Sequence, residues 1–224
     1  MSILDNLKTC YEGPDDSLGD DFIKPCIKEC VLYKRETAWF RSTVIRAWGD
    51  SLTNIIEKKD AKIEIIAYPQ IDKSTKIALD NSLNQEARES IIKEHSQRIL
   101  LKVLNIDANR EIHNWETGKD IGETLSYLIA DEKLEIRFAT CINHNDYQVV
   151  PDDADEDTLT HGKRGYFNFP CGTNVSFSGS ANESHAGLMK QGENFDVFDS
   201  RVENQAWKVE EHIEKVDDTW DGKR

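Results

Sequence analysis

Long apolar runs and basic residues are what this sequence has least of. No stretch approaches the roughly 18 apolar residues that a membrane-spanning helix needs, and the N-terminus lacks a signal peptide's basic start and apolar core. Lys and Arg number 28 against 42 Asp and Glu, which gives the 224-residue chain a net charge of -14. This balance disfavours a generic basic nucleic-acid binder and a protein that binds anionic membranes. We therefore expect a cytoplasmic protein without membrane contact, in which any polyanion meets a local site.

Cysteine is also scarce, with five residues, an odd number in a chain without a secretory signal. Reduced thiols in a cytosolic protein are the simplest interpretation. One four-ligand zinc set can be assembled, from Cys26, Cys30, Cys141 and His144. The spacing between its first two cysteines matches structural zinc poorly, so we favour buried free thiols and expect neither a metal nor a cofactor.

The length suits one domain that buries on the order of 70% of its unfolded surface. Residues 1–28 are polar and acidic, and Gly13-Pro14 and Gly19 interrupt any pattern, which predicts an irregular acidic lead-in. Residues 29–224 are expected to form the single domain. It should end in an amphipathic helix, 202–220, whose apolar seam packs against its own domain or, alternatively, against a partner.

Hydrophobic periodicity predicts strands that alternate with helices, followed by a run of strands. The expected helices are 43–58, 84–104, 119–131, a brief turn near 183–190, and 202–220. The expected strands are within 30–40, then 62–67, 134–138, 161–169, 174–179 and 195–198. The acidic segment 151–157 reads as a solvated surface loop. This order predicts an α/β fold with a mixed sheet flanked by helices.

A histidine and a lysine lie two residues apart on the strand predicted at 161–169. His161 and Lys163 should therefore point to the same face. An ammonium beside an imidazole is what an anion site needs, because the cation neutralises phosphate charge while the imidazole attacks or moves a proton. A His-x-Lys pair alone is more often structural, so the surrounding residues decide its meaning.

The following strand ends in a second group of polar residues. Gly179 lets the backbone come close to a ligand, while Ser180 and Asn182 offer a hydroxyl and an amide to phosphate oxygens. They lead into a short helix whose first N–H groups favour an anion. Glu193 precedes the next strand, where it is placed to accept a proton from the other ring nitrogen of His161.

The ordered set His161-x-Lys163 and Gly179-Ser180-x-Asn182 resembles the HKD motif of the phospholipase D superfamily. The sequence from Gly179 to Ser200 is similar to that of the single-motif domains at the N-termini of bacterial restriction and defence helicases. The resemblance covers residues 161–200 and implies a phospholipase D-like fold. It implies these catalytic residues: His161, Lys163, Asn182 and Glu193. It also implies these phosphate-binding residues: Lys163, Gly179, Ser180 and Asn182.

Two features depart from the motif. The family's Asp, five positions after the Lys, is Asn168 here, and the gap that follows it is longer than usual. That Asp generally lies outside the chemical centre, so we expect a structural variation. The longer gap predicts an extended hairpin turn, with Pro170 and Gly172 at its bend.

The resemblance implies a metal-independent, two-step cleavage of phosphodiesters through a phosphohistidine. One imidazole attacks phosphorus, while a second protonates the leaving oxygen and then activates water. The chain holds one His-x-Lys and one Gly-Ser-x-Asn, whereas the site needs two of each. A homodimer with one composite site is therefore expected.

The resemblance favours a DNA nuclease (an endonuclease) of bacterial antiviral defence or restriction, with DNA as substrate and a helicase domain or subunit as a possible partner. A phosphodiesterase for a phospholipid or another small phosphodiester is one alternative. A non-catalytic dimerising module that binds nucleic acid is another, and it belongs to a different class. DNA versus RNA, strandedness and sequence preference are left open.

One modest basic cluster lies near the start of the domain. It consists of Lys34, Arg35, Arg41 and Arg46, with Trp39 and Phe40 between them. A base-stacking, phosphate-binding strip is one interpretation, and buried aromatics beside solvated charges is the favoured one. From residue 161 onward there are 8 basic and 11 acidic residues, a net of -3, so -11 of the total -14 lies before the motif. We therefore expect weak capture of free DNA.

Overall fold

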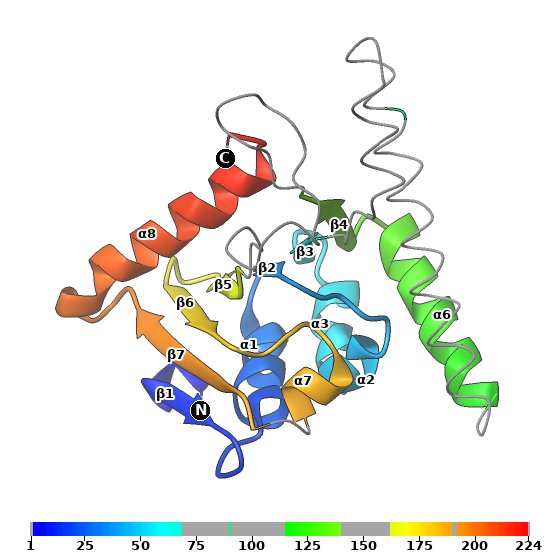
Figure 1. Ribbon diagram of the computed structural model, residues 1–224, viewed down its shortest axis with the longest axis horizontal. Coiled ribbons are helices and arrows are strands. Elements are labelled where there is room, and N and C mark those ends of the chain that lie inside the picture. Colours follow the sequence, from blue (N-terminus) through cyan, green and yellow to red (C-terminus); the bar gives the residue numbers. More distant parts are fainter. Residues whose placement is uncertain (1, 69–89, 91–114, 140–161, 190–191, 224) are drawn as a thin grey trace, which may run out of the picture.

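The computed structural model describes residues 2–68, 90, 115–139, 162–189 and 192–223 (Figure 1). Its strands are β1 (Cys10–Glu12), β2 (Leu32–Thr37), β3 (Lys62–Ala67), β4 (Leu134–Phe138), β5 (Arg164–Asn168), β6 (Asn174–Gly179) and β7 (Asn194–Asp199). Its α-helices are α1 (Lys24–Glu29), α2 (Val44–Trp48), α3 (Leu52–Glu57), α6 (Trp115–Ala130), α7 (His185–Met189) and α8 (Glu203–Trp220). The other helical segments are the 3₁₀ turns η1 (Ile3–Asp5) and η3 (Gly49–Ser51) and the π-helix η2 (Leu18–Ile23).

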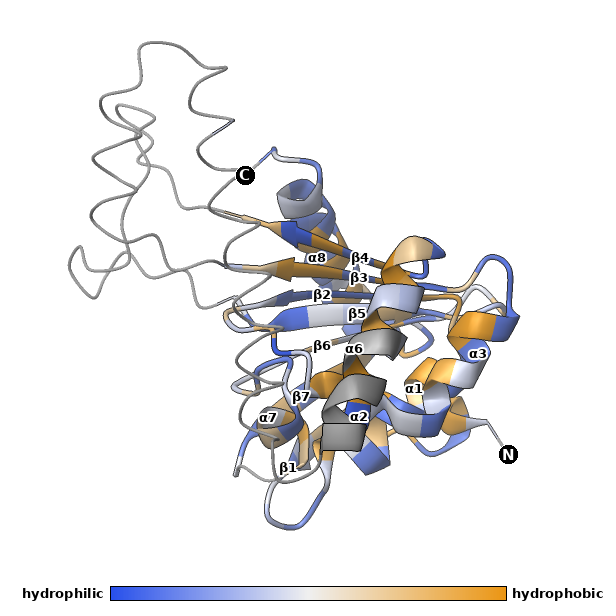
Figure 2. Ribbon diagram, turned by 90° about the vertical axis from the view of Figure 1, so that its right-hand side faces the viewer, coloured by the Kyte–Doolittle hydropathy of each residue, from blue (hydrophilic) through white to orange (hydrophobic). Residues whose placement is uncertain are grey.

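The described strands form one seven-stranded sheet in the order β1-β7-β6-β5-β2-β3-β4. The pairs β2–β3 and β3–β4 are parallel, and the other pairs are antiparallel. Helices cover both sides (Figure 2), with α8 on one side and α1, α2, α3 and α6 on the other. The expected α/β class, a mixed sheet flanked by helices, is confirmed.

The two faces of the sheet carry different cores, because successive side chains of a strand alternate in direction. One face packs aromatic rings around Phe22, which meets Phe167 and Phe177 edge to face at centroid distances of 5.6 and 5.3 Å. The other face holds the smaller cluster formed by Ile66, Tyr166, Val216 and Trp220. The larger core thus lies on the side of α1 and α2.

The C-terminal helix α8 packs on its own sheet, over β5, β6 and β7. Its docking is partly polar, because Asp217 Oδ1 accepts from Lys34 Nζ and from the Tyr166 hydroxyl, each at 2.8 Å. His212 Nδ1 lies 3.1 Å from the hydroxyl of Ser176 on β6. Of the two interpretations of the apolar seam, packing within the domain holds.

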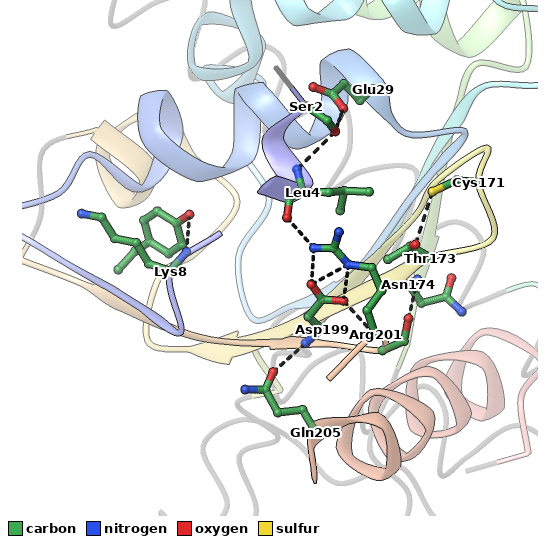
Figure 3. Close-up of polar contacts among 12 residues, drawn as sticks. Ser2, Leu4, Lys8, Glu29, Cys171, Thr173, Asn174, Asp199, Arg201 and Gln205 are labelled. Carbon is green, nitrogen blue, oxygen red and sulfur yellow. Dashed lines mark hydrogen bonds and ion pairs between the residues drawn. The ribbon is translucent and has the colours of Figure 1, made fainter. Parts of the chain in front are cut away.

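The irregular lead-in predicted for residues 1–28 is a wrong expectation. Residues 10–12 form β1 and pair with β7, and η2 and α1 bury Phe22 and Ile27 completely. Figure 3 shows the start of the chain held by Arg201, which donates to the Leu4 carbonyl and pairs with Asp199 at 2.6 Å. The apolar residues of this segment recur at helical spacing, but its glycines, proline and acidic residues obscured that pattern.

The other predicted elements agree with the structure apart from their ends. The helix expected at 43–58 is interrupted by η3, because Gly49 adopts a positive φ of 52° where α2 ends. The strand expected at 161–169 begins at Arg164. The helix expected at 84–104, except Ser90, and the acidic loop 151–157 lie outside the described residues. Of the helices in the described ranges, none has both the length and the apolar composition required to cross a bilayer.

Candidate functional site

Three neighbouring strands bring the predicted phosphate-binding segments together at one end of the sheet. The backbone N–H of Gly179 donates to the carbonyl of Lys163 at 3.1 Å, which joins the start of β5 to the end of β6. The N–H of Ser180 donates to the carbonyl of Asn194 at 3.1 Å, which joins that end to the start of β7. Glu193 immediately precedes Asn194. Residues from three separate segments therefore lie together where these strands begin or end.

Gly179 has a structural reason to be glycine. A Cβ built at this position would overlap the backbone carbonyl of Asn194 on β7. The missing side chain thus lets β6 and β7 approach where the site begins. The space beside Gly179 is filled by the neighbouring strand, whereas the sequence interpretation reserved it for a ligand.

The Ser180 hydroxyl is oriented by Asn194, a residue that the sequence interpretation missed. Ser180 Oγ donates to Asn194 Oδ1 at 3.1 Å and accepts from the Asn194 N–H at 3.2 Å. The Ser180 side chain is nevertheless exposed, so its hydroxyl lies at the surface. Asn194 follows Glu193 directly, but an asparagine at a strand start carries no sequence signal that distinguishes it.

Lys163 lies just before β5 and is half-buried. Burial lowers the pKa of its ammonium, the negative charge of Glu193 opposes this, and the positive charge of Arg35 acts in the same direction as burial. Glu193 and Arg35 are thus both close enough to influence Lys163. The structure therefore gathers a lysine, a carboxylate and a buried guanidinium around the start of β5.

Arg35 is the main residue of this region that sequence reasoning did not single out as part of the site. Its side chain is fully buried, and its guanidinium pairs with the equally buried carboxylate of Glu183. A second guanidinium nitrogen donates to the carbonyl of Ala181. The guanidinium also lies over the ring of Phe195, 5.0 Å from its centroid. Arg35 thereby contacts the residues on both sides of Asn182, through the Ala181 carbonyl and the Glu183 carboxylate.

Glu183 is held by several groups besides Arg35. Its carboxylate accepts from the Tyr33 hydroxyl at 2.9 Å and from Trp48 Nε1 at 2.8 Å. Its backbone N–H donates to Thr37 Oγ1 and to the Trp39 carbonyl, each at 3.1 Å. The segment after β6 is therefore anchored by side chains from β2 and α2.

Asn182 lies between these anchored residues. Its backbone carbonyl accepts from the N–H of Ser184 at 2.9 Å, and a Cβ on Gly187 would overlap the same carbonyl. Its side-chain Oδ1 is buried, without a hydrogen-bond partner among the described residues. A buried amide oxygen without a partner is costly, so this oxygen is a candidate to accept a hydrogen bond from a further donor.

His161, the predicted nucleophile, lies outside the described residues. Its neighbour Gly162 is described and lies against the side chain of Glu36, which a Cβ would overlap. Glu36 is buried and pairs with Arg164 Nε at 3.1 Å. The structure therefore places Lys163, Gly179, Ser180, Asn182 and Glu193, but leaves the position of the imidazole as an expectation.

Asn168, which stands where the motif has Asp, lies at the opposite end of β5 from Lys163. It pairs with Asn174 across the hairpin to β6, and its carbonyl accepts from the N–H of Val31 at 2.8 Å. The turn closes with the N–H of Gly172 donating to the Phe169 carbonyl at 2.9 Å, and Gly172 has a φ of 83°. The extended hairpin turn predicted for this gap is confirmed.

The thiols proposed as half of a zinc set are buried. Burial raises the pKa of Cys26, and it raises that of Cys30 to about 12. The Cys30 thiol donates to the Ile27 carbonyl at 3.7 Å. Cys141 and His144 lie outside the described residues, and within the described ranges no three His, Cys, Asp or Glu residues are grouped so that they could hold a metal ion.

The basic cluster identified in the sequence contains both buried and exposed residues. Lys34 and Arg35 are buried, and Lys34 Nζ pairs with Glu64 at 3.0 Å. Trp39 is 44% exposed and Arg41 is also exposed, whereas Phe40 is buried. Neither sequence interpretation holds in full, because half of the charges are internal and one of the two aromatic residues is external.

The chain is similar to solved structures but to no family model or curated protein. The chain is similar to the structure of NucT from Helicobacter pylori, with a TM-score of 0.40 and 13% sequence identity over 94% of each chain. A likeness of this size leaves both family and activity to be argued from the residues of this chain.

Proposed function

We propose that this chain is a metal-independent phosphodiesterase, a DNA nuclease that resembles the single-motif phospholipase D-like domains of bacterial defence and restriction systems. One observation carries the proposal. Lys163, Ser180 and Glu193, which the motif assigns to phosphate binding and proton transfer, come from three segments joined by backbone hydrogen bonds at one end of the sheet. Asn182 follows in the same anchored segment, and its side-chain N–H groups, rather than its oxygen, would donate to phosphoryl oxygens.

The proposed chemistry proceeds in two displacements at phosphorus. An imidazole nitrogen of His161 forms a bond to phosphorus, and the bond from phosphorus to the leaving oxygen breaks as a second imidazole donates its proton to that oxygen. That second imidazole then takes a proton from water, whose oxygen displaces His161. Lys163, Ser180 and Asn182 stabilise the negative charge on the phosphoryl oxygens during both displacements. Glu193 accepts a hydrogen bond from the imidazole that it orients.

The second imidazole is proposed to come from another copy of the chain. The sequence contains one His-x-Lys and one Gly-Ser-x-Asn, so a complete site needs two chains related by a two-fold axis. The net charge of -14 implies that such a dimer binds free DNA weakly. Delivery of DNA by a helicase domain or subunit is therefore part of the proposal.

The deciding experiment is cleavage of plasmid and single-stranded DNA with EDTA present. We expect the unaltered chain to cut and His161→Ala to be inactive, while Lys208→Met, altered on α8, retains activity. Retention of DNA on a gel without cutting by any of these proteins would instead support the non-catalytic binding module. Hydrolysis of phosphatidylcholine but not DNA would support the lipid alternative.

Sedimentation tests the composite site separately. We expect the active species to be a dimer at the concentrations at which cleavage is measured. When His161→Ala is mixed with the unaltered chain, activity should fall more than in proportion to the fraction of unaltered chains. The reason is that a mixed dimer lacks one of the two imidazoles. A protein that cleaves while it sediments only as a monomer contradicts the composite site.

A further inference from the structure

An extended segment, residues 39–41, runs beside the loop that contains Asn182. The N–H of Glu183 donates to the Trp39 carbonyl at 3.1 Å, and the N–H of Arg41 donates to the Glu183 carbonyl at 3.0 Å. These two bonds form a parallel bridge between Phe40 and Glu183. Residues 39–41 are thus attached to the residue that directly follows Asn182.

The side chains of this segment alternate in direction. Phe40 is 6% exposed and belongs to the core, whereas Trp39 is 44% exposed and Arg41 is exposed. In an extended chain, residues two apart project to the same side and are about 7 Å from each other. An indole and a guanidinium therefore project together from a strip next to the candidate site.

The Arg41 guanidinium is available for a ligand as far as the described part of the chain shows. No hydrogen bond or ion pair joins this side chain to another described residue, in contrast to the nearby Arg35, whose charge is paired with Glu183. In a chain of net charge -14, this exposed cation places a positive charge beside the segment that contains Asn182.

We infer that Trp39 and Arg41 form a subsite for unpaired nucleic acid, in which Trp39 stacks on a base and Arg41 binds a phosphate next to the one that is cleaved. Stacking on an aromatic side chain combined with a cation on the backbone is how proteins hold single strands without reading sequence. A paired duplex already stacks both faces of its bases, so an exposed indole favours an unpaired strand. The inference rests on the proposed function and adds its substrate class.

The test measures binding in a His161→Ala background, so that cleavage does not remove the probe. A fluorescein-labelled oligothymidylate is titrated and its anisotropy followed at several salt concentrations. We expect Trp39→Ala to weaken binding about 5-fold to 150-fold, the range measured for loss of one stacked base. Arg41→Ala should weaken binding and reduce the slope of log K against log salt by about 0.7, the value for one phosphate contact on a single strand.

Control variants come from another exposed tryptophan and another exposed cationic residue. Trp207 is 62% exposed and belongs to α8, which lies on the opposite side of the sheet from α2, so Trp207→Ala should leave affinity unchanged. Lys59→Ala removes an exposed charge after α3 and should alter the salt slope less than Arg41→Ala. Thermal unfolding of each variant establishes that the fold is retained.

The outcomes separate this inference from the proposed function. If the chain with His161 intact cleaves DNA, but Trp39→Ala and Arg41→Ala bind and cleave as well as the unaltered chain, the subsite is overturned and the nuclease stands. If both variants lose binding while no protein cleaves, the subsite stands and the nuclease falls. Absence of oligonucleotide binding by the His161→Ala protein, or binding of duplex that equals binding of single strand, overturns the subsite.

Discussion

The guanidinium of Arg35 is paired with the carboxylate of Glu183, 148 residues later in the chain, and neither side chain has any exposure to solvent. The pair connects β2, an interior strand of the sheet, to the loop that follows β6. Because Arg35 also donates to the Ala181 carbonyl, it holds the residues on both sides of Asn182. A core ion pair is thus part of the geometry of the candidate site.

Removal of one partner of this pair should be strongly destabilising. Arg35→Met leaves the Glu183 carboxylate buried without its cation, for which a loss of about 3–5 kcal/mol in the free energy of unfolding is expected. Urea unfolding monitored by tryptophan fluorescence measures it. The exposed pair between Lys28 and Asp50, at 2.9 Å, is the control, and Lys28→Met should cost less than about 1 kcal/mol. Equal losses in the two variants would contradict the structural role of the pair.

The stability of the protein should depend on pH through His212. Burial lowers the pKa of His212 to about 4, and the charges of Lys208 and Arg164 act in the same direction. The unfolded chain therefore binds a proton at this histidine at higher pH than the folded chain does. The free energy of unfolding is unaffected by His212 above about pH 6.5 and decreases as pH falls toward 4. This decrease amounts to about 3 kcal/mol at most. Urea unfolding between pH 7 and 4 should show a weaker pH dependence in His212→Gln, and identical profiles would refute the assignment.

Activity at alkaline pH should report on Lys163. Because burial lowers the pKa of this ammonium, its charge is lost at lower pH than that of an ordinary lysine. As pH rises, the rate of DNA cleavage should therefore begin to fall at a pH lower than 10.5, the usual pKa of lysine. Lys163→Arg should retain part of the activity and shift this fall to higher pH. Lys163→Met should lower cleavage by about 100-fold or more, as the loss of a group that stabilises charge in the transition state does. A pH profile that is the same with lysine and arginine argues against this role.

The four described cysteines should react with iodoacetamide in a definite order. The hydrogen bond with Thr173 lowers the pKa of the exposed Cys171, whereas burial raises that of Cys10. Thiolate is the reactive form, so Cys171 should be labelled before Cys10, and the buried Cys26 and Cys30 only after unfolding. Peptide mass mapping over time measures the order. Thr173→Val removes the hydrogen bond drawn in Figure 3 and should slow labelling of Cys171 specifically.

Gly179 should tolerate substitution less well than a glycine in an open turn. A Cβ at Gly179 would overlap the Asn194 carbonyl, whereas one at Gly172 meets nothing within 4 Å. Gly172→Ala should therefore cost only the strain of its positive φ, on the order of 1–2 kcal/mol. Gly179→Ala should cost more and should also lower DNA cleavage, because it separates β6 from β7 beside Ser180. Urea unfolding and the plasmid assay distinguish the two variants.

Much of the architecture could be predicted from local pattern alone. The alternation of Leu134, Ile136 and Phe138 predicted β4, and the spacing of Val209, Val216 and Trp220 predicted the buried face of α8. Both succeed because a strand or helix that covers a core must repeat apolar residues at its own period. The N-terminal segment was mispredicted because turn residues and charges outweighed the apolar repeat that includes Phe22 and Ile27.

The sequence by itself determined which residue types are available for chemistry and the order in which they occur, since the motif from Lys163 to Glu193 can be read along the chain. Only the tertiary structure decided their surroundings. Arg35, read as part of an exposed basic cluster, is a buried partner of Glu183, while Trp39 and Arg41 remain outside. Strand pairing brings distant residues together and decides which side chains are buried, and no local pattern contains that information.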